Sequence, residues 1–94
     1  MQSNFLLGKL TMTEPARMAL KRHPYDLVCR HAINDHGEIS KDEQTMNDIG
    51  MKTLGPIMSR YKSDPTDPHS PNVIIFTKDT WSETLIALET DPVR

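Results

Sequence analysis

Residues 73–89, VIIFTKDTWSETLIALE, predict two β-strands joined by a short turn. The run VIIF is apolar at consecutive positions, which is typical of a central strand that is covered on both faces. The segment ETLIALE predicts a second strand, and the turn DTWS between them is short enough for a hairpin. A sheet built on such a hairpin needs a second layer, so we expect helices to pack against it.

Two further strands and three helices are expected in the rest of the chain. NFLLGKLTM, residues 4–12, predicts a strand interrupted at Gly8, and PIMSRYKS, residues 56–63, predicts another. Thr13 is a suitable N-cap for a helix of about two turns that ends before Pro24, because proline disfavours a helical conformation in the residue before it.

The second and third predicted helices meet at a polar corner. PYDLVCRHAIND begins with a proline, which the first helical turn tolerates, and the turn residues NDHG end it. Ser40 and Glu43 have the spacing of a capping box at the start of the third helix, which runs to about Thr53. This helix carries an apolar stripe that comprises Met46, Ile49, Gly50 and Leu54.

These elements predict an α+β fold, with a small antiparallel sheet of three to four strands packed against two to three helices. The 94 residues are expected to form a single domain, residues 1–94. Only 36% of the residues are hydrophobic, so the core is thin, and contact with a partner or a homodimer would hide more apolar surface.

Charge and composition exclude several function classes. The net charge of −2 disfavours direct binding to nucleic acid, which requires a basic face. Cys29 is the single cysteine, so no internal disulfide forms. The start MQSNFLLGKL lacks the features of a signal peptide, and no apolar run approaches the roughly 20 residues that cross a bilayer. A cytoplasmic protein without membrane contact is expected.

The corner RHAINDHGEISKDEQTMN, residues 30–47, concentrates polar side chains. His31 and Asp35 are four residues apart and His36 follows, so the three could bind a metal with a fourth ligand from His23 or His69. The simpler interpretation is turn chemistry, in which asparagine and aspartate side chains bond to nearby backbone. Because neither HExxH nor paired CxxC is present, we expect no metal, no cofactor and no metalloenzyme.

An enzyme is the less favoured function class. Hydroxyl side chains such as Ser59, Thr77 and Thr84 could meet His31 and His36 in the fold. No nucleophile elbow, phosphate loop or paired-carboxylate pattern accompanies them, so no catalytic residue is assigned. We expect the polar side chains to form a satisfied hydrogen-bond network, in which Arg30 and Asp35 are hydrogen-bonded to backbone or to each other and Asn47 lies close enough to join them.

Three segments in order resemble a family of small bacterial proteins common on plasmids and other mobile elements. The segments are RHAINDHGEISKDEQTMN, IMSRY and VIIFTKDTWSETLIALE, against family patterns RH…GDWG…D…N, I.S.Y and W.IT…DRS.TT.LLP. The resemblance covers about residues 4–90. Two positions depart from the pattern: His36 stands where the family has tryptophan, and Trp81 stands where it has arginine.

The resemblance implies a phage or mobile-element setting more than a reaction. We therefore expect a small non-enzymatic protein that binds a host protein, as an inhibitor of host defence in a counter-defence role. The alternative is a module that binds or sequesters a small polar, nucleotide-like ligand. The family pattern and the polar character of the segments together give ten candidate residues for contact with a ligand or partner: Arg30, His31, Asp35, His36, Asn47, Ser59, Tyr61, Thr77, Trp81 and Thr84.

A protein-binding function also requires an exposed surface. The candidate is the exposed face of the sheet, which carries Met58, Arg60, Ile74 and Phe76 or their alternating neighbours. Trp81, in the turn, is expected either to extend that surface or to fold back over the edge of the sheet.

Overall fold

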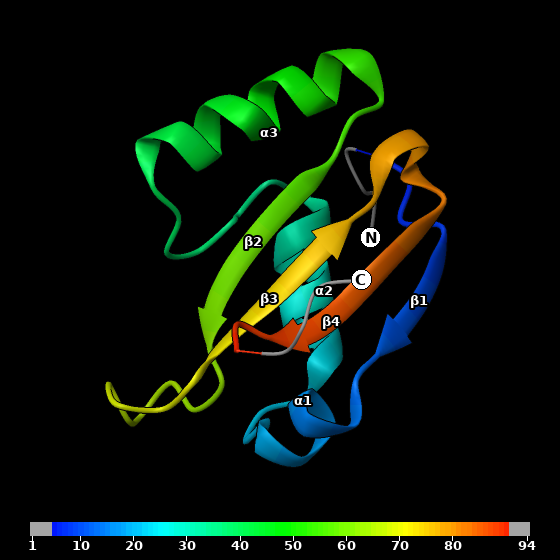
Figure 1. The fold of residues 1–94 in the computed structure, drawn as a ribbon. Helices are drawn as coiled ribbons and strands as arrows, with labels where there is room; N and C mark the ends of the chain where they lie inside the picture. The colour runs from blue at the N-terminus through cyan, green and yellow to red at the C-terminus, as the bar shows by residue number, and fades with distance from the viewer. Residues whose placement is uncertain (1–4, 91–94) are drawn as a thin grey trace.

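Four strands form one mixed sheet in the order β1-β4-β3-β2, and the computed structural model describes this fold over residues 5–90 (Figure 1). The strands are β1 (Lys9–Met12), β2 (Ile57–Lys62), β3 (Asn72–Thr77) and β4 (Glu83–Leu88). The helices are α1 (Glu14–Ala19), α2 (Pro24–Ala32) and α3 (Lys41–Thr53), and a short 3₁₀ turn, η1 (Asp79–Trp81), joins β3 to β4.

The predicted α+β class is confirmed, with one difference in the sheet. Strands β2, β3 and β4 are antiparallel neighbours, whereas β1 pairs with β4 in parallel. A helical segment separates β1 from the rest of the sheet, so no tight turn dictates its direction. The first strand is also shorter than predicted: it begins at Lys9, after Gly8, which has a positive φ of 64°. Residue 4 lies outside the described residues.

The helix starts follow the predicted capping residues. The Thr13 side chain accepts a hydrogen bond from the Ala16 backbone N–H at the start of α1. At the start of α3, Ser40 and Glu43 form both bonds of the capping box. Helix α2 ends at Ala32, and Leu54 rather than Gly55 takes the left-handed conformation after α3.

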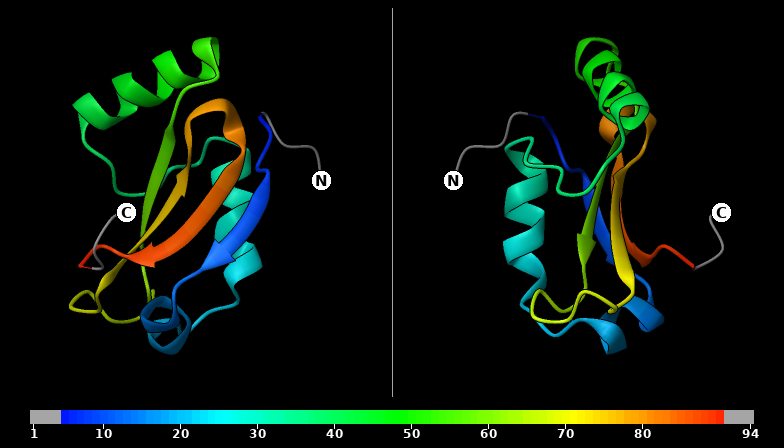
Figure 2. Two further views of the ribbon diagram at one scale, coloured as in Figure 1. Left: turned by 45° about the vertical axis from the view of Figure 1, so that its right-hand side comes forward. Right: turned by 90° about the vertical axis from the view of Figure 1, so that its left-hand side faces the viewer.

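Helix α2 covers one face of the sheet, which we call the inner face (Figure 2). Its buried residues Leu27 and Val28 pack with Tyr61, Val73 and Ile75 in the core. Helix α1 lies near one end of the sheet, and α3 lies across the other end beside β2. Among residues 5–90, no helix lies over the opposite, outer face, although α3 borders it. The core is therefore a single layer between α2 and the sheet.

The outer edge of β2 is closed by hydrogen bonds from outside the sheet. Asn47 of α3 binds Met58 twice: the Met58 backbone N–H donates to Oδ1, and Nδ2 donates to the Met58 carbonyl oxygen, both at 2.8 Å. Two residues further, the Arg60 N–H donates to the His36 carbonyl at 3.0 Å, and the Glu38 N–H donates to the Arg60 carbonyl at 2.8 Å. These bonds protect an edge that could otherwise pair with another chain.

Gly37 makes this close approach to β2 possible. Its φ is +70°, a conformation that side chains disfavour, and a Cβ placed there would lie 2.2 Å from the Arg60 carbonyl oxygen. The segment 36–38 therefore lies against the strand only because residue 37 has no side chain.

Helix α3 is attached to the sheet by polar contacts. Asn47 and Gly50 are its buried residues, and Glu43 on the same side binds Arg60. Three members of the apolar stripe, Met46, Ile49 and Leu54, are instead 50–57% exposed. Asn47 thus has the attaching role that an apolar side chain has in most helices.

We predict that Asn47→Ala destabilises the domain by about 2 to 3 kcal/mol, because both backbone groups of Met58 lose their partner in a partly buried setting. In a domain of this size that corresponds to a fall in melting temperature of roughly 10 °C or more. Thermal unfolding followed by circular dichroism measures it. Thr45→Ala, on the exposed side of the same helix, is the control and should change stability by less than about 0.5 kcal/mol. Equal stability of the two variants would contradict the attachment.

Candidate functional site

A continuous row of buried hydrogen bonds crosses the inner face of the sheet. It joins His36, Ser59 of β2, His31 of α2, Thr77 of β3 and Thr84 of β4, and it ends on the backbone carbonyl of Leu7. Ser59, Thr77, Thr84 and His31 are all 0% exposed, and His36 is 5% exposed. We call these five side chains the polar row. Five of the ten candidate residues from the sequence therefore belong to one structure.

The direction of every bond in the polar row follows from its last acceptor. A carbonyl oxygen only accepts, so the Thr84 hydroxyl donates to Leu7 O at 2.6 Å. A hydroxyl has one proton, so Thr77 must donate to Thr84 at 2.7 Å, and Nε2–H of His31 must donate to Thr77 at 2.8 Å. Neutral His31 then accepts at Nδ1 from Ser59 at 2.6 Å.

The last bond of the row determines which ring nitrogen of His36 carries the proton. Since the Ser59 proton is used toward His31, Nδ1–H of His36 donates to Ser59 Oγ at 2.7 Å. The row therefore requires His31 protonated at Nε2 and His36 protonated at Nδ1, both neutral. Each hydroxyl donates once and accepts once, so the row is fully satisfied.

Burial keeps the two histidines neutral. Loss of hydration, followed by the nearby His36, lowers the pKa of His31 from 6.5 to about 3. Burial also lowers the pKa of His36, partly opposed by the carboxylates of Asp35 and Asp48. At neutral pH both rings carry the single proton that the row demands.

The arrangement does not place Ser59 for nucleophilic attack. Its Oγ lies between two imidazoles, but it is fully buried, its proton is donated to His31, and it accepts a hydrogen bond from His36. The metal interpretation of His31, Asp35 and His36 meets a similar objection, since both ring nitrogens of His31 are bonded to hydroxyls. Within residues 5–90, no three His, Cys, Asp or Glu side chains gather as a metal site.

Arg30 and Asp35 form an ion pair at the surface of the corner, so of the two alternatives from the sequence their side chains bind each other. Nε and Nη2 of Arg30 donate to the two carboxylate oxygens at 2.7 and 3.2 Å. The Arg30 guanidinium also lies 4.8 Å from the centre of the Tyr61 ring, and the Tyr61 hydroxyl donates to the Asp35 carbonyl oxygen at 2.6 Å. Bonding to Arg30 lowers the pKa of Asp35, and burial raises that of Tyr61 to about 12. The expectation that Asn47 joins this pair is wrong, because Asn47 binds Met58.

Trp81 folds back toward the inner layer and does not extend the outer face. Its Nε1–H donates to the Gly55 carbonyl oxygen at 2.9 Å, and the centre of its ring lies 5.6 Å from the centre of the Phe5 ring. Phe5 in turn meets His31 edge to face at 5.1 Å. The sequence did not indicate Phe5 as a neighbour of this row, since a lone aromatic near the start of the chain has no distinguishing pattern.

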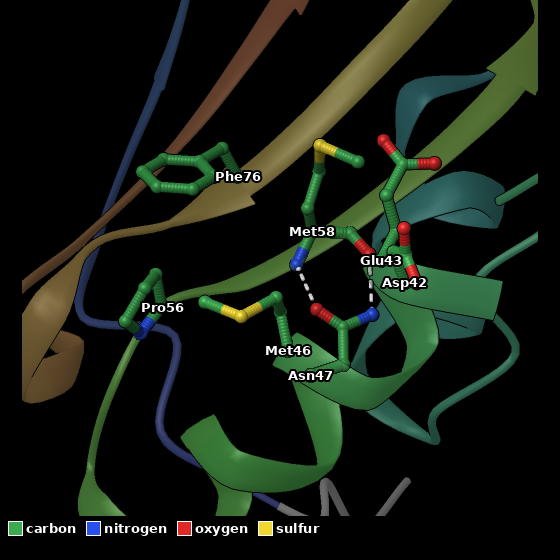
Figure 3. A pocket seen from close by; sticks show the side chains of 7 residues that line it. All are labelled: Asp42, Glu43, Met46, Asn47, Pro56, Met58 and Phe76. Atoms are coloured by element: carbon green, nitrogen blue, oxygen red, sulfur yellow. Dashed lines mark hydrogen bonds between the residues drawn. The ribbon is translucent and has the colours of Figure 1, made fainter. Parts of the chain in front are cut away.

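A hollow that the sequence did not predict lies between α3 and the outer face (Figure 3). It has a volume of about 270 Å³. Met46 extends from α3 toward Pro56, with Phe76 and Met58 of the sheet on the facing side. Asp42 and Glu43 form its rim, and hydrogen bonds from Arg60 and then Ser40 lower the pKa of Glu43 to about 2. We call this the α3 groove.

No protein-family model, curated protein or solved structure matches the chain. The resemblance to the mobile-element family therefore stays a prediction. None of the helices in residues 5–90 is long and apolar enough to cross a membrane.

We predict that Thr77→Val and Thr84→Val each destabilise the domain by about 2 kcal/mol, because each leaves a buried neighbour unpaired. The double variant should cost clearly less than the sum, since two members of one network do not act independently. Urea unfolding measures the double-mutant cycle. Thr11→Val is the control with a smaller effect, because the Thr11 hydroxyl makes only one long hydrogen bond, of 3.3 Å, to the Glu83 carboxylate. Additive costs would contradict a connected row.

We also predict that the free energy of unfolding decreases as the pH is lowered below about 6.5. The folded protein holds His31 and His36 neutral while the unfolded chain takes up protons, so their contribution is complete above pH 6.5 and is lost toward lower pH. For His31 the slope approaches about 1.4 kcal/mol per pH unit well below its ordinary pKa, and His36 adds to it in the same direction. Asp35 and Glu43 also have lowered pKa values, and they add to the loss of stability from about pH 5 downward.

Unfolding free energies between pH 5 and 7 measure this slope. His36→Asn keeps an N–H donor near Ser59 without a titrating group, so it should reduce the slope. His69→Gln, in the exposed loop, should leave it unchanged. A flat profile in the unaltered protein would contradict neutral buried histidines.

Proposed function

We propose that this protein acts by binding another protein through the α3 groove and the apolar surface beside it. The observation that carries the proposal is the reversed orientation of α3. Its polar residues Asn47 and Glu43 attach it to β2, while Met46 and Ile49 are 57% and 50% exposed. A helix that turns apolar side chains to solvent next to an apolar hollow is typical of an interaction site.

The outer face of the sheet continues this surface. Met58, Phe76 and Leu85 lie in one row across β2, β3 and β4, and Ile74 lies beside them. All four are partly exposed. Of the two alternating sets that the sequence left open, the one with Met58, Ile74 and Phe76 is therefore the partly exposed one, and a contact of about 800 Å² per partner would occupy much of this face.

The lining of the α3 groove favours a protein over a small polar molecule. Its walls are apolar, formed by Met46, Pro56, Met58 and Phe76, and the polar groups of Asn47 are already bonded to Met58. It suits a single large apolar side chain that anchors a partner. Two of its walls are methionines, whose flexible thioethers adapt to the shape of an inserted group.

The charge at the rim of the α3 groove indicates which charge the partner carries. Asp42 lies on the rim and makes no ion pair within the described residues, whereas Glu43 is already paired with Arg60. We therefore propose a partner segment with one large apolar anchor beside a lysine or arginine that reaches Asp42. The resemblance to mobile-element proteins favours a host protein in the bacterial cytoplasm, and inhibition of a host defence component would be the consequence of such binding.

We predict that Met46→Ser weakens the binding of a partner purified from a bacterial host at least tenfold, because an anchor contact at the centre of an interface is lost. Met18→Ser is the matched control: Met18 is 70% exposed on α1, away from the groove, and should have no effect. Isothermal titration calorimetry provides both values. Equal losses in the two variants, or none, would contradict the assignment of the surface.

The charge on the partner is tested separately. Asp42→Asn should weaken binding and reduce its dependence on salt, while Asp26→Asn, in the first turn of α2, should do neither. If the recovered partner is a second copy of this chain, sedimentation analysis will show a dimer that Met46→Ser disrupts. That result would replace the host protein as the occupant of the groove.

A further inference from the structure

A second hollow, lined mainly by cationic side chains, lies beside the C-terminal half of β2. Its volume is about 200 Å³. Four of the side chains that line it are Arg22, Arg30, Arg60 and Lys62, and Glu38 is the only acidic one. The chain as a whole has a net charge of −2, so this concentration of positive charge is local.

Two of these cations are already engaged. Arg60 donates to Glu43, Glu89 and the Glu38 carbonyl oxygen, so all three of its nitrogens have acceptors. Arg30 uses Nε and Nη2 on Asp35 and is held against the Tyr61 ring, which leaves Nη1 in a fixed position without an acceptor in the described residues. Arg60 therefore lines the hollow with each of its nitrogens already bonded, whereas Arg30 offers Nη1 as a donor whose position is already fixed.

Arg22 lacks an acceptor that its position requires. Its Nε is buried, and no atom within residues 5–90 accepts a hydrogen bond from it. A buried guanidinium N–H without an acceptor costs free energy of folding, and such groups are rarely left unpaired. Arg22 also lines the hollow, so its guanidinium adds a positive charge there that no carboxylate of the described residues neutralises through an ion pair.

The backbone of β2 adds a donor at the same place. The backbone groups of Met58 and Arg60 point out of the sheet edge and are bound by Asn47, His36 and Glu38. By the alternation of an antiparallel strand, the N–H of Lys62 points out of the same edge. The Lys62 side chain lines the hollow and has no ion pair in the described part of the chain.

We propose that this hollow binds the phosphate group of a small anion, with Arg22, Arg30 and Lys62 as the ligating residues. These side chains come from three separate segments of the chain, and a phosphate has enough oxygens to accept from all of them and from the Lys62 N–H, whereas a carboxylate has two. The volume of about 200 Å³ accommodates such a group, and the remainder of a larger ligand would lie in solvent. This function goes beyond protein binding by the α3 groove, and the two can fail independently.

Amide ¹H–¹⁵N spectra during a titration with inorganic phosphate, at constant ionic strength set by chloride, test the site. Saturable shifts are expected at Gly37 and Lys62. O-phosphoserine, added as the free amino acid, distinguishes a phosphate monoester from free phosphate, and acetate should bind at least tenfold more weakly than either. Acetate binding as tight as phosphate would overturn the assignment to phosphate.

Two variants and a control decide whether the named residues are responsible. Arg22→Gln and Lys62→Gln should each weaken phosphate binding at least tenfold, and unchanged shifts elsewhere in the spectrum show that each variant is folded. Lys52→Gln removes one charge on α3 and should bind as the unaltered protein does. No saturable binding, unaltered binding by both variants, or an equal loss in Lys52→Gln would overturn the proposal.

Discussion

The polar row on the inner face is the constraint on which the rest of the structure depends. A small domain with few large apolar residues ties α2 to three strands by hydroxyl and imidazole groups, in addition to the packing of Leu27, Val28 and Ile75. Such a row stabilises only when every member is satisfied, because an unpaired buried polar group is costly. The carbonyl of Leu7 settles its direction, so a backbone atom before β1 determines the tautomer of a histidine on α2.

The small number of apolar side chains in the core also explains the exposed apolar surface of α3. Polar contacts attach the corner and α3 to β2: Asn47 to Met58, Glu43 to Arg60, and the segment 36–38 to the strand edge. Because these bonds attach the helix, Met46 and Ile49 can face solvent, and Met46 lines the groove together with Phe76. The groove and the basic hollow lie on either side of the Arg60–Glu43 pair, which separates an apolar, acid-rimmed surface from a cationic one.

The sequence predicted the elements well and their contacts unevenly. Capping residues and the hairpin were predictable because Thr13, Ser40 and Glu43 act on their own neighbours in the chain. The ion pair of Arg30 and Asp35 was predictable for the same reason. The parallel direction of β1 was not, since a four-residue strand encodes no direction. Nor was the orientation of α3: its apolar stripe indicated a buried side, and only the fold shows that Asn47 has a strand backbone to bind.

The state of the two buried histidines tests the account most directly. Nitrogen-15 chemical shifts of the imidazole rings at pH 7 distinguish the two neutral tautomers from the imidazolium form. The polar row predicts His31 protonated at Nε2 and His36 protonated at Nδ1, both neutral. Protonation of His31 at Nδ1, or a charged ring at either position, would contradict the direction of the row and with it the central claim.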